Sequence, residues 1–466
     1  MKTHDNILTT RYGGVIPIIE KLYSLGIPQL IDSTANEISP RAKQSKYKFS
    51  DLFLTWVSAA MCGAMRIDNV TSLKEQLEVI PGLNVPSHDT VGRLMKKLAT
   101  PIVRHDNVSQ RRVTPNEYDD NLPLNRLLIQ ATLASGALKK GQEYILDVDC
   151  TFIHTASINA SALNKDKRQG FNPMICLIGN LPVFISMRNG NSVADYREAE
   201  CIGTSLDFLK AEGITISHVR TDGAGYKEGL TKMLNDRGIN FLTASPVNKT
   251  YKKMFNAFEE SPWEKAIIET ATEFKNCEVA EIEYSMTNLD EKWRIIAQRV
   301  PLNDSCSHEE KKRRREVDAK MKKLAAKKRL KSHQKRYAEG DWSAVVDYKY
   351  KMIATNDFDT PIVELIKTYN ERGTAERQFS FMKQDFGWKY PPFMRMNENT
   401  VFFIITAIAN NIFRAMAEKL NEHIDDIELN ARVRRFQKAF INTVAICQDG
   451  HNWIFFSAKI DFEKIK

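Results

Sequence analysis

The feature that most constrains this fold is an alternation of short strands with helices that begins near Glu143. Tyr144–Phe152 has the apolar content of a strand, and two further strands are expected on either side of a Gly179-Asn180 turn. These two strands are Met174–Ile178 and Val183–Arg188. Further strands are expected at His218–Thr221 and Asn240–Ala244, and helices at Ala199–Ala211 and Lys227–Arg237. Strands that alternate with helices after a hairpin predict an α/β core with a mixed sheet.

The regions on either side of this core have a different character. Before it, apolar residues recur at helical spacing in Val15–Leu25 and Ser50–Met65, which predicts a helical N-terminal region. After it, the expected elements are strands at Val279–Tyr284, Trp293–Val300 and Tyr348–Ala354, a helical stretch from Pro361 to Phe386, a helix at Asn399–Leu420 and an edge strand in Trp453–Ile460.

A short basic helix is expected at His88–Leu98, with Ser87 as its N-cap. It carries Arg93, Lys96 and Lys97. A helix entered through a Ser after a turn that contains Pro is compatible with the second helix of a helix-turn-helix. The alternative is an ordinary bundle helix with a solvated basic face.

Charge favours a polyanionic partner. The chain has 67 Lys and Arg against 58 Asp and Glu, a net charge of +9. The stretch Glu309–Gly340 alone holds 14 basic against 5 acidic residues, which equals the whole excess. It is either a solvated arm or an arm that faces DNA.

Cysteine usage and hydropathy predict a reduced, cytoplasmic protein with no membrane partner. The seven cysteines are odd in number and form no C-x2-C pair, which argues against a disulfide framework and a zinc ribbon. The longest mostly apolar run, Val401–Ala409, is far shorter than the roughly 20 residues that a membrane span needs.

Two groups of acids lie in or directly after predicted strands. Asp147 and Asp149 share one face of the first strand, where burial is costly unless a partner neutralises them. A divalent cation such as Mg²⁺ is one such partner, while solvent or an Arg or Lys is the alternative. Asp222 ends a strand before Gly223, a position where α/β sheets commonly bind ligands, although a turn-forming Asp would look the same.

A third group lies in the helical stretch after Pro361. Tyr369, Arg372, Glu376 and Lys383 fall within roughly 60° on one face if the helix is continuous. Such a face suits a site that binds a metal and a phosphate together, whereas the alternative is an exposed helix with ion pairs. Gly373 weakens a continuous helix, so a start near Thr374 is also expected.

These residues carry a family resemblance. Tyr369-x2-Arg372-x3-Glu376-x6-Lys383 matches the Y-x2-R-x3-E-x6-K signature of insertion-sequence-4-like bacterial transposases at every position. Asp149-Cys150-Thr151 and Arg220-Thr221-Asp222 resemble the motifs of the first and second acids of that family. The features that resemble its insertion-sequence-1380 branch are Gly13-Gly14, Arg66-Ile67-Asp68, Pro86-Ser87-x2-Thr90-x2-Arg93 and the run from Tyr369 to Glu376.

The resemblance implies a transposase with a ribonuclease H-like core that binds terminal inverted repeats, excises the element and inserts it by strand transfer from a 3′-OH. Asp149, Asp222 and Glu376 would hold two Mg²⁺ ions, for which Mn²⁺ can substitute, with Asp147 as the second candidate for the first acid. The other implied roles are phosphate binding by Tyr369, Arg372 and Lys383, DNA binding by Arg93, Lys96 and Lys97, and base stacking by Trp293 or Trp263.

Four regions and one assembly are expected on this basis. They are a helical DNA-binding region at 1–135, a catalytic core at 136–245 and 345–415, an insertion domain with the basic arm at 246–344, and a C-terminal region at 416–466. The partners are double-stranded DNA and a second copy of the chain, because two transposon ends must be brought together. The alternatives are a metal-dependent nuclease without strand transfer, a transposase-derived DNA-binding protein, and a basic RNA-associated protein.

Overall fold

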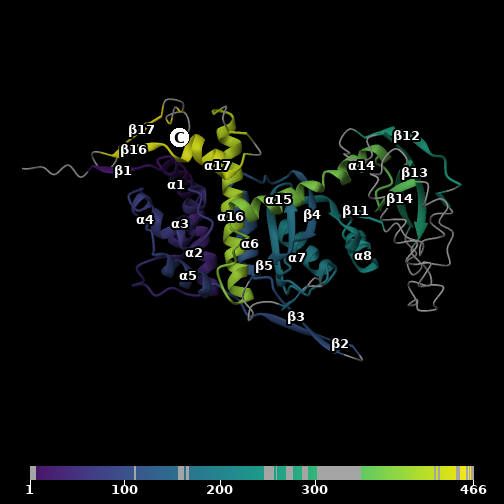
Figure 1. Cartoon of the computed structure of the whole chain (residues 1–466), viewed down its shortest axis with the longest axis horizontal. Coiled ribbons are helices and arrows are strands. Elements are labelled where there is room, and N and C mark those ends of the chain that lie inside the picture. The colour runs from purple at the N-terminus through teal and green to yellow at the C-terminus, as the bar shows by residue number, and fades with distance from the viewer. Residues whose placement is uncertain are drawn as a thin grey trace, which may run out of the picture. The chain divides into compact units, whose positions relative to one another are not determined.

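The chain forms two compact units in a computed structural model (Figure 1). The first unit comprises Met1–Tyr144, Val148–Thr215 and Ala375–Lys466, and the second comprises Ile145–Asp147 and Ile216–Thr374. The structure describes residues 7–109, 112–155, 162–163, 167–245, 257–258, 260–268, 276–285, 292–301, 348–424, 427–428, 431–447, 452–457, 460 and 462. The basic stretch Glu309–Gly340 lies outside these residues.

Helices dominate the N-terminal part of the first unit. They are α1 (Val15–Ser24), α2 (Ile27–Ile38), α3 (Phe49–Met61), α4 (Asn69–Leu77), α5 (His88–Lys97) and α6 (Leu122–Ser135). The helices expected at Val15, Ser50 and His88 are therefore present. Ser87 caps α5 as expected, because its Oγ accepts a hydrogen bond of 3.4 Å from the backbone N–H of Thr90.

An antiparallel hairpin interrupts this helical region. It consists of β2 (Val103–Ser109) and β3 (Arg112–Asp119), and only Tyr118 and Asp119 of β3 pair with the next strand, β9 (Figure 1). The sequence analysis expected helices here. The hairpin strands are polar and lack the alternating apolar residues that mark a half-buried strand, so the sequence offered no periodic signal.

The strands expected after Glu143 are present. In the first unit the order is β4-β8-β9-β3-β2, with β4 at Glu143–Cys150, β8 at Met174–Ile178 and β9 at Leu181–Arg188. Gly179 forms the turn between β8 and β9 with φ +60°, and α7 follows at Glu198–Ala211. Two small sheets complete the strands: β5 (Ile153–His154), β7 (Gln169–Phe171) and β6 (Ala162–Leu163); and β1 (Leu8–Thr10), β16 (Val444–Cys447) and β17 (Trp453–Phe456).

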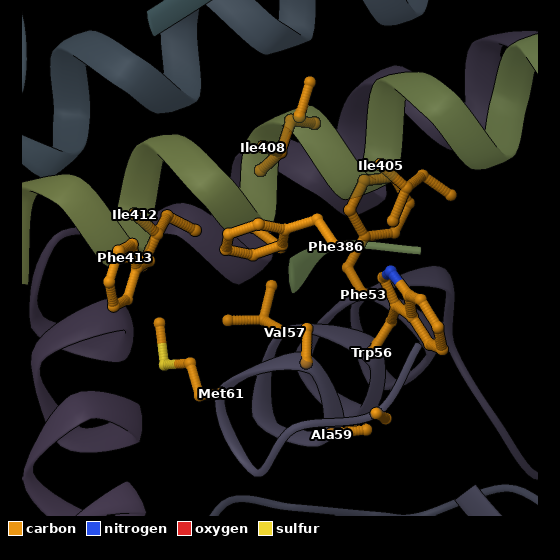
Figure 2. Packing of buried hydrophobic residues seen from close by; sticks show 14 of the residues in the cluster. Phe53, Trp56, Val57, Ala59, Met61, Phe386, Ile405, Ile408, Ile412 and Phe413 are labelled. Atoms are coloured by element: carbon orange, nitrogen blue, oxygen red, sulfur yellow. The ribbon is translucent and has the colours of Figure 1, made fainter. Parts of the chain in front are cut away.

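The core of the first unit is organised around α16 (Met396–Asn421), which packs against α6, β9 and α3. Figure 2 shows Phe53 and Val57 of α3 on the same side of α16 as Ile412 and Phe413. The 18-residue window of highest hydropathy in α16, with a mean of 1.5, is entirely buried within the protein. Its apolar character is therefore that of a core helix. The shorter helical segments after it are α17 (Val433–Phe436) and a π-helical turn, η3 (Gln437–Ile441).

The second unit is a sheet with helices. Its strand order is β12-β13-β14-β15-β11-β10-β4, where β10 (Thr215–Thr221) and β11 (Asn240–Ala244) are parallel and the pairs from β11 to β12 are antiparallel. The other strands are β12 (Glu264–Ile267), β13 (Asn276–Ser285), β14 (Lys292–Pro301) and β15 (Tyr348–Thr355). The helices are η1 (Gly223–Gly225), α8 (Glu228–Asp236) and α14 (Ile362–Asn370). The strands expected within 246–344 thus extend the same sheet as β11.

The paired glycines near the N-terminus pack against the C-terminal part of the chain. The Gly13 N–H donates a 2.6 Å hydrogen bond to the carbonyl of Thr443, and the Gly14 N–H donates to that of Ile441. A Cβ on Gly14 would lie 2.4 Å from the carbonyl oxygen of Phe440. Because the obstacle is backbone, no side-chain rotation can relieve it, and only glycine fits at this crossing.

We predict that Gly14→Ala lowers the free energy of unfolding by about 1–3 kcal/mol, because overpacking against backbone forces the two segments apart. Gly92→Ala is the matched control. Its new Cβ would meet Phe393 at 3.8 Å, an ordinary contact, and alanine favours a helix interior, so stability should be unchanged or slightly higher. Thermal unfolding measures both. Equal melting temperatures for the two variants would contradict this account of Gly14.

Candidate functional site

Asp149 lies near the C-terminal end of β4, in the first unit. Its side chain is half-buried, and its Oδ1 accepts a 2.7 Å hydrogen bond from the backbone N–H of Cys150. Two residues later, the Thr151 Oγ1 accepts a 2.6 Å hydrogen bond from the Lys383 ammonium, which also donates to the carbonyl of Phe152 at 3.1 Å. The last residue of the four-residue signature is therefore held at the strand end that carries the first acid.

Lys383 belongs to α15, which spans Gly373–Asp385 and also carries Glu376 in its first turn. The two residues are seven positions apart, so they lie about 20° apart around the helix and roughly 10 Å apart along it. Glu376 is exposed, whereas Lys383 is half-buried, and burial lowers the pKa of the Lys383 ammonium from its ordinary value. This face of α15 therefore carries an acid and a cation, and the cation contacts the strand end next to Asp149.

Arg188, which the sequence analysis did not single out, organises the backbone around Asp149. Its side chain is 0% exposed. The guanidinium donates to the carbonyls of Asn172 at 3.0 Å, Ala194 at 3.2 Å and Tyr196 at 2.5 Å, and to the Cys150 Sγ at 2.8 Å. It thus ties the end of β4 to the loop after β9. The available signal was a lone arginine at the end of an otherwise apolar strand.

Asp147 has a different environment from Asp149. It is fully buried in the second unit, and the Arg220 guanidinium donates to its Oδ1 at 2.6 Å and to its Oδ2 at 2.7 Å. Burial raises the pKa of Asp147, and these hydrogen bonds oppose that rise. Both oxygens of Asp147 are thus bound by an arginine, which is the alternative to a metal ion that its sequence pattern also allowed.

Asp222 follows β10 and caps the short helix η1. Its Oδ1 accepts a 2.8 Å hydrogen bond from the backbone N–H of Ala224, and its carbonyl accepts one of 2.8 Å from the Thr243 hydroxyl. The Tyr369 hydroxyl donates to the carbonyl of Thr221 at 3.2 Å. The first residue of the signature is therefore held beside the second acid, and both contacts lie within the second unit.

The four signature residues do not share one helix. Tyr369 is on α14, which ends at Asn370, and α15 begins at Gly373. Arg372 lies in the two-residue junction between them, and only Glu376 and Lys383 are on α15. The break expected at Gly373 is present, so the single 60° face that a continuous helix would produce is not formed.

The acids expected to hold metal ions are divided between the two units. Asp149 and Glu376 belong to the first, and Asp222 to the second. Among the described residues of either unit, no three His, Cys, Asp or Glu side chains lie close enough together to hold an ion. The three acids supply only carboxylate oxygens, which suit a hard cation such as Mg²⁺.

The aromatic residues considered for base stacking have different surroundings. Trp293 is 0% exposed, and its ring packs edge-on against Tyr226 and Phe241, each at 5.3 Å between ring centroids. A ring enclosed in the core in this way offers no face to a DNA base, unlike the exposed aromatic side chain that base stacking requires. Trp263 is half-buried, with the Arg299 guanidinium 3.8 Å from its ring centroid.

The basic residues of α5 are accessible. Arg93, Lys96 and Lys97 are all exposed, while Val91, Leu94 and Met95 turn inward to the core. This amphipathic arrangement leaves a cationic face on the first unit, as the sequence predicted.

Comparison with known proteins identifies a family for this chain. A search of curated proteins finds no match. One solved structure with some likeness is the piggyBac transposase synaptic complex with hairpin DNA, determined by cryo-electron microscopy; it has 10% sequence identity, covers 91% of this chain and 78% of that chain, and has a TM-score of 0.42, too low to bear on the assignment. The model of the family described as transposase DDE domain group 1 matches residues 10–431, a span that includes the three acids and the whole signature. The chain therefore belongs to the transposase DDE domain group 1 family.

Proposed function

We propose that this protein is a DNA transposase of the insertion-sequence-4-like superfamily, in its insertion-sequence-1380 branch, that excises a DNA element at its terminal inverted repeats and inserts it elsewhere. The observation that carries the proposal is the placement of the signature. Lys383 is bound at the strand end of Asp149, and Tyr369 is bound beside Asp222. Residues far apart in the sequence are thus held beside two of the three acids.

In this proposal Asp149, Asp222 and Glu376 bind two Mg²⁺ ions, within a core of ribonuclease H-like type. Two such ions, when bound, stabilise the attacking and leaving oxygens of an in-line displacement at phosphorus. Mn²⁺ has the same preference for carboxylate oxygens and can substitute. The protein acts from the cytoplasm as a homodimer on double-stranded DNA, since two ends are joined in one reaction.

The cationic and phenolic members of the signature bind phosphate. Lys383 carries its charge at the strand end of Asp149, where it can hold a terminal phosphate as a point charge. Arg372 lies in the short junction between α14 and α15, and its planar guanidinium suits bidentate contact with phosphate oxygens. Tyr369 is oriented by its hydrogen bond to Thr221. Together they fix the scissile phosphate relative to the acids.

Arg188 has a positioning role in this proposal. Its hydrogen bonds to three backbone carbonyls and to the Cys150 thiol hold the residue next to Asp149, and its own charge stays buried. If the backbone beside Asp149 is already fixed, less free energy is needed to bring its carboxylate into the reactive geometry.

The first prediction of this proposal concerns cleavage. With Mg²⁺, the purified protein should cut a labelled duplex that carries the inverted repeats flanking its own gene, and EDTA should abolish cutting. Glu376→Gln should reduce the rate at least roughly 100-fold, about 2.7 kcal/mol of barrier. Glu364→Gln, an exposed glutamate on α14, is the matched control and should cut normally.

The products separate this proposal from its competitors. Joined products report strand transfer, and a hairpin at the cut end reports the route of second-strand cleavage. Cleavage without any joined product, under conditions where 3′-OH ends accumulate, would indicate a nuclease instead. Specific binding without cleavage in either Mg²⁺ or Mn²⁺ would indicate a DNA-binding derivative.

A second prediction distinguishes the two neighbouring aspartates. Asp149→Asn should abolish cleavage and leave thermal stability nearly unchanged, because asparagine keeps a side-chain oxygen that can accept the hydrogen bond from the Cys150 N–H. Asp147→Asn should destabilise the protein by about 3–5 kcal/mol, because it leaves the buried Arg220 charge without its partner. Rates are to be compared at a temperature where both variants are folded. A stable but inactive Asp147→Asn would reverse the assignment of the first acid.

A third prediction concerns Lys383. Lys383→Met should slow cleavage at least tenfold and weaken binding of the cut end, whereas Lys383→Arg should retain part of both, because it keeps the charge. Lys419→Met removes an exposed lysine of α16 and serves as the control. Single-turnover rates at saturating protein separate the chemical step from binding. Normal rates for Lys383→Met would rule out the phosphate-binding role.

A further inference from the structure

A cluster of exposed cations gathers on the first unit, around the segment that follows α15. We define it as the basic corner: Arg66, Arg93, Lys96, Lys97 and Lys389, all exposed. We propose that the basic corner binds the phosphate backbone of duplex DNA next to the cleavage site. This inference rests on the proposed function. It adds the surface that contacts the DNA backbone outside the metal site.

Three cation–aromatic pairs join the parts of the basic corner. The Arg66 guanidinium lies 4.5 Å from the ring centroid of Tyr390, and the Lys389 ammonium lies 5.7 Å from the same ring. The Lys96 ammonium lies 5.4 Å from the ring centroid of Phe393. Tyr390 and Phe393 are three residues apart, so their Cα atoms lie within about 10 Å. Cations from three places in the sequence are thus gathered around one short segment.

The segment itself is held firmly. A Cβ on Gly387 would lie 2.2 Å from the carbonyl oxygen of Met65, so its backbone passes directly against the residue before Arg66. Phe393 and Trp388 are buried, and the ring of Trp388 stacks on Phe403 of α16 at 4.8 Å. A segment packed in this way holds the rings, and the rings restrict the cations, which reduces the entropy lost when a phosphate binds.

The face of α5 continues the same surface. Arg93, Lys96 and Lys97 are spaced three and four residues apart, so they share one helix face. Arg93 also donates a 2.9 Å hydrogen bond to the Thr90 hydroxyl. The acids on these elements are Asp68, which is exposed, and Asp89, whose Oδ1 lies 3.4 Å from the His88 Nε2. Five cations against two acids leave a positive surface that complements a polyanion.

DNA is the partner that this charge pattern and its location favour. Tyr390 is seven residues after Lys383, so at most about 25 Å of chain separates the basic corner from the phosphate-binding lysine of the proposed site. A DNA duplex whose end lies at Lys383 is longer than this distance, so it is long enough to reach the basic corner. Two residues of the basic corner, Arg66 and Arg93, belong to the motifs Arg66-Ile67-Asp68 and Ser87-x2-Thr90-x2-Arg93. The catalytic proposal assigns no role to these motifs.

The test is the salt dependence of DNA binding. A four-residue variant, Arg66→Gln, Lys96→Gln, Lys97→Gln and Lys389→Gln, is compared with a control that removes the same charge from other exposed lysines of the first unit: Lys139→Gln, Lys140→Gln, Lys210→Gln and Lys419→Gln. Fluorescence anisotropy in EDTA, where no cutting occurs, gives Kd for a duplex with the flanking repeats and for a scrambled duplex. Thermal unfolding confirms that both variants are folded.

If the basic corner contacts four phosphates, the slope of log K against log salt should fall by roughly 3 to 4, since each contact contributes about 0.9. Kd at 0.1 M salt should rise at least about 100-fold, equally for both duplexes, because phosphate contacts carry no sequence information. The control variant should change the slope by less than about 1. A charge-preserving pair, Arg66→Lys and Lys96→Arg, should bind as the parent does.

Three outcomes overturn the inference. If both four-residue variants lose the same affinity, only net charge matters. If the basic-corner variant binds and cuts normally, this surface is not used, while the transposase proposal stands. If affinity falls for the repeat duplex alone, the surface reads bases and does not bind the backbone. A parent protein that binds no duplex at any salt concentration would remove the proposed function itself.

Discussion

The first unit depends on the burial of α16. This 26-residue helix is almost entirely enclosed, and it contacts helices α3 and α6 from the N-terminal part of the chain and strand β9 from the middle. Apolar burial of this extent supplies most of the favourable free energy of the unit. Polar side chains that enter the same interface are paired, as where the Trp56 indole donates to the Thr406 hydroxyl at 3.1 Å. Segments separated by hundreds of residues are therefore assembled as one body.

That assembly explains how one chain segment can serve two purposes. Helix α15 precedes α16 and is bound to it, with the Gln378 amide donating to the Asn410 side chain at 3.2 Å. Because α15 is anchored in this way, Lys383 reaches the end of β4, and the segment after α15 reaches Arg66 and α5. Helix α15 thus connects the strand end next to Asp149 to the basic corner.

Buried arginines perform the local positioning in both units. In the second, Arg220 neutralises Asp147 and also donates to the Thr368 carbonyl, so it joins β4, β10 and α14. In the first, Arg188 satisfies its donors with backbone carbonyls and a thiol, and among the described residues it forms no ion pair. A guanidinium suits both roles because its five donors are planar and fixed.

Local pattern determined much of the secondary structure. The strands at Met174–Ile178 and Asn240–Ala244 have the expected bounds, and helix α7 begins one residue before its expected start, because their apolar periodicity reflects burial directly. The β2–β3 hairpin was missed because its pairing is backbone-driven and its sequence is polar. Spacing also identified Asp149, Asp222 and Glu376 as candidates, since a family signature is a property of sequence order.

Only the tertiary structure decided which polar side chains share an environment. Sequence placed Asp147 and Asp149 on one strand face, with Asp147 as the second candidate for the first acid. The structure distinguishes them, because it pairs Asp147 with an arginine 73 residues away. Trp293 could have been a surface aromatic until the sheet enclosed it. The sequence by itself determined the order and chemistry of the motifs, because these depend on residue identity and local periodicity. Which of them are neutralised, enclosed or exposed depends on contacts between distant segments, and those contacts exist only once the chain has folded.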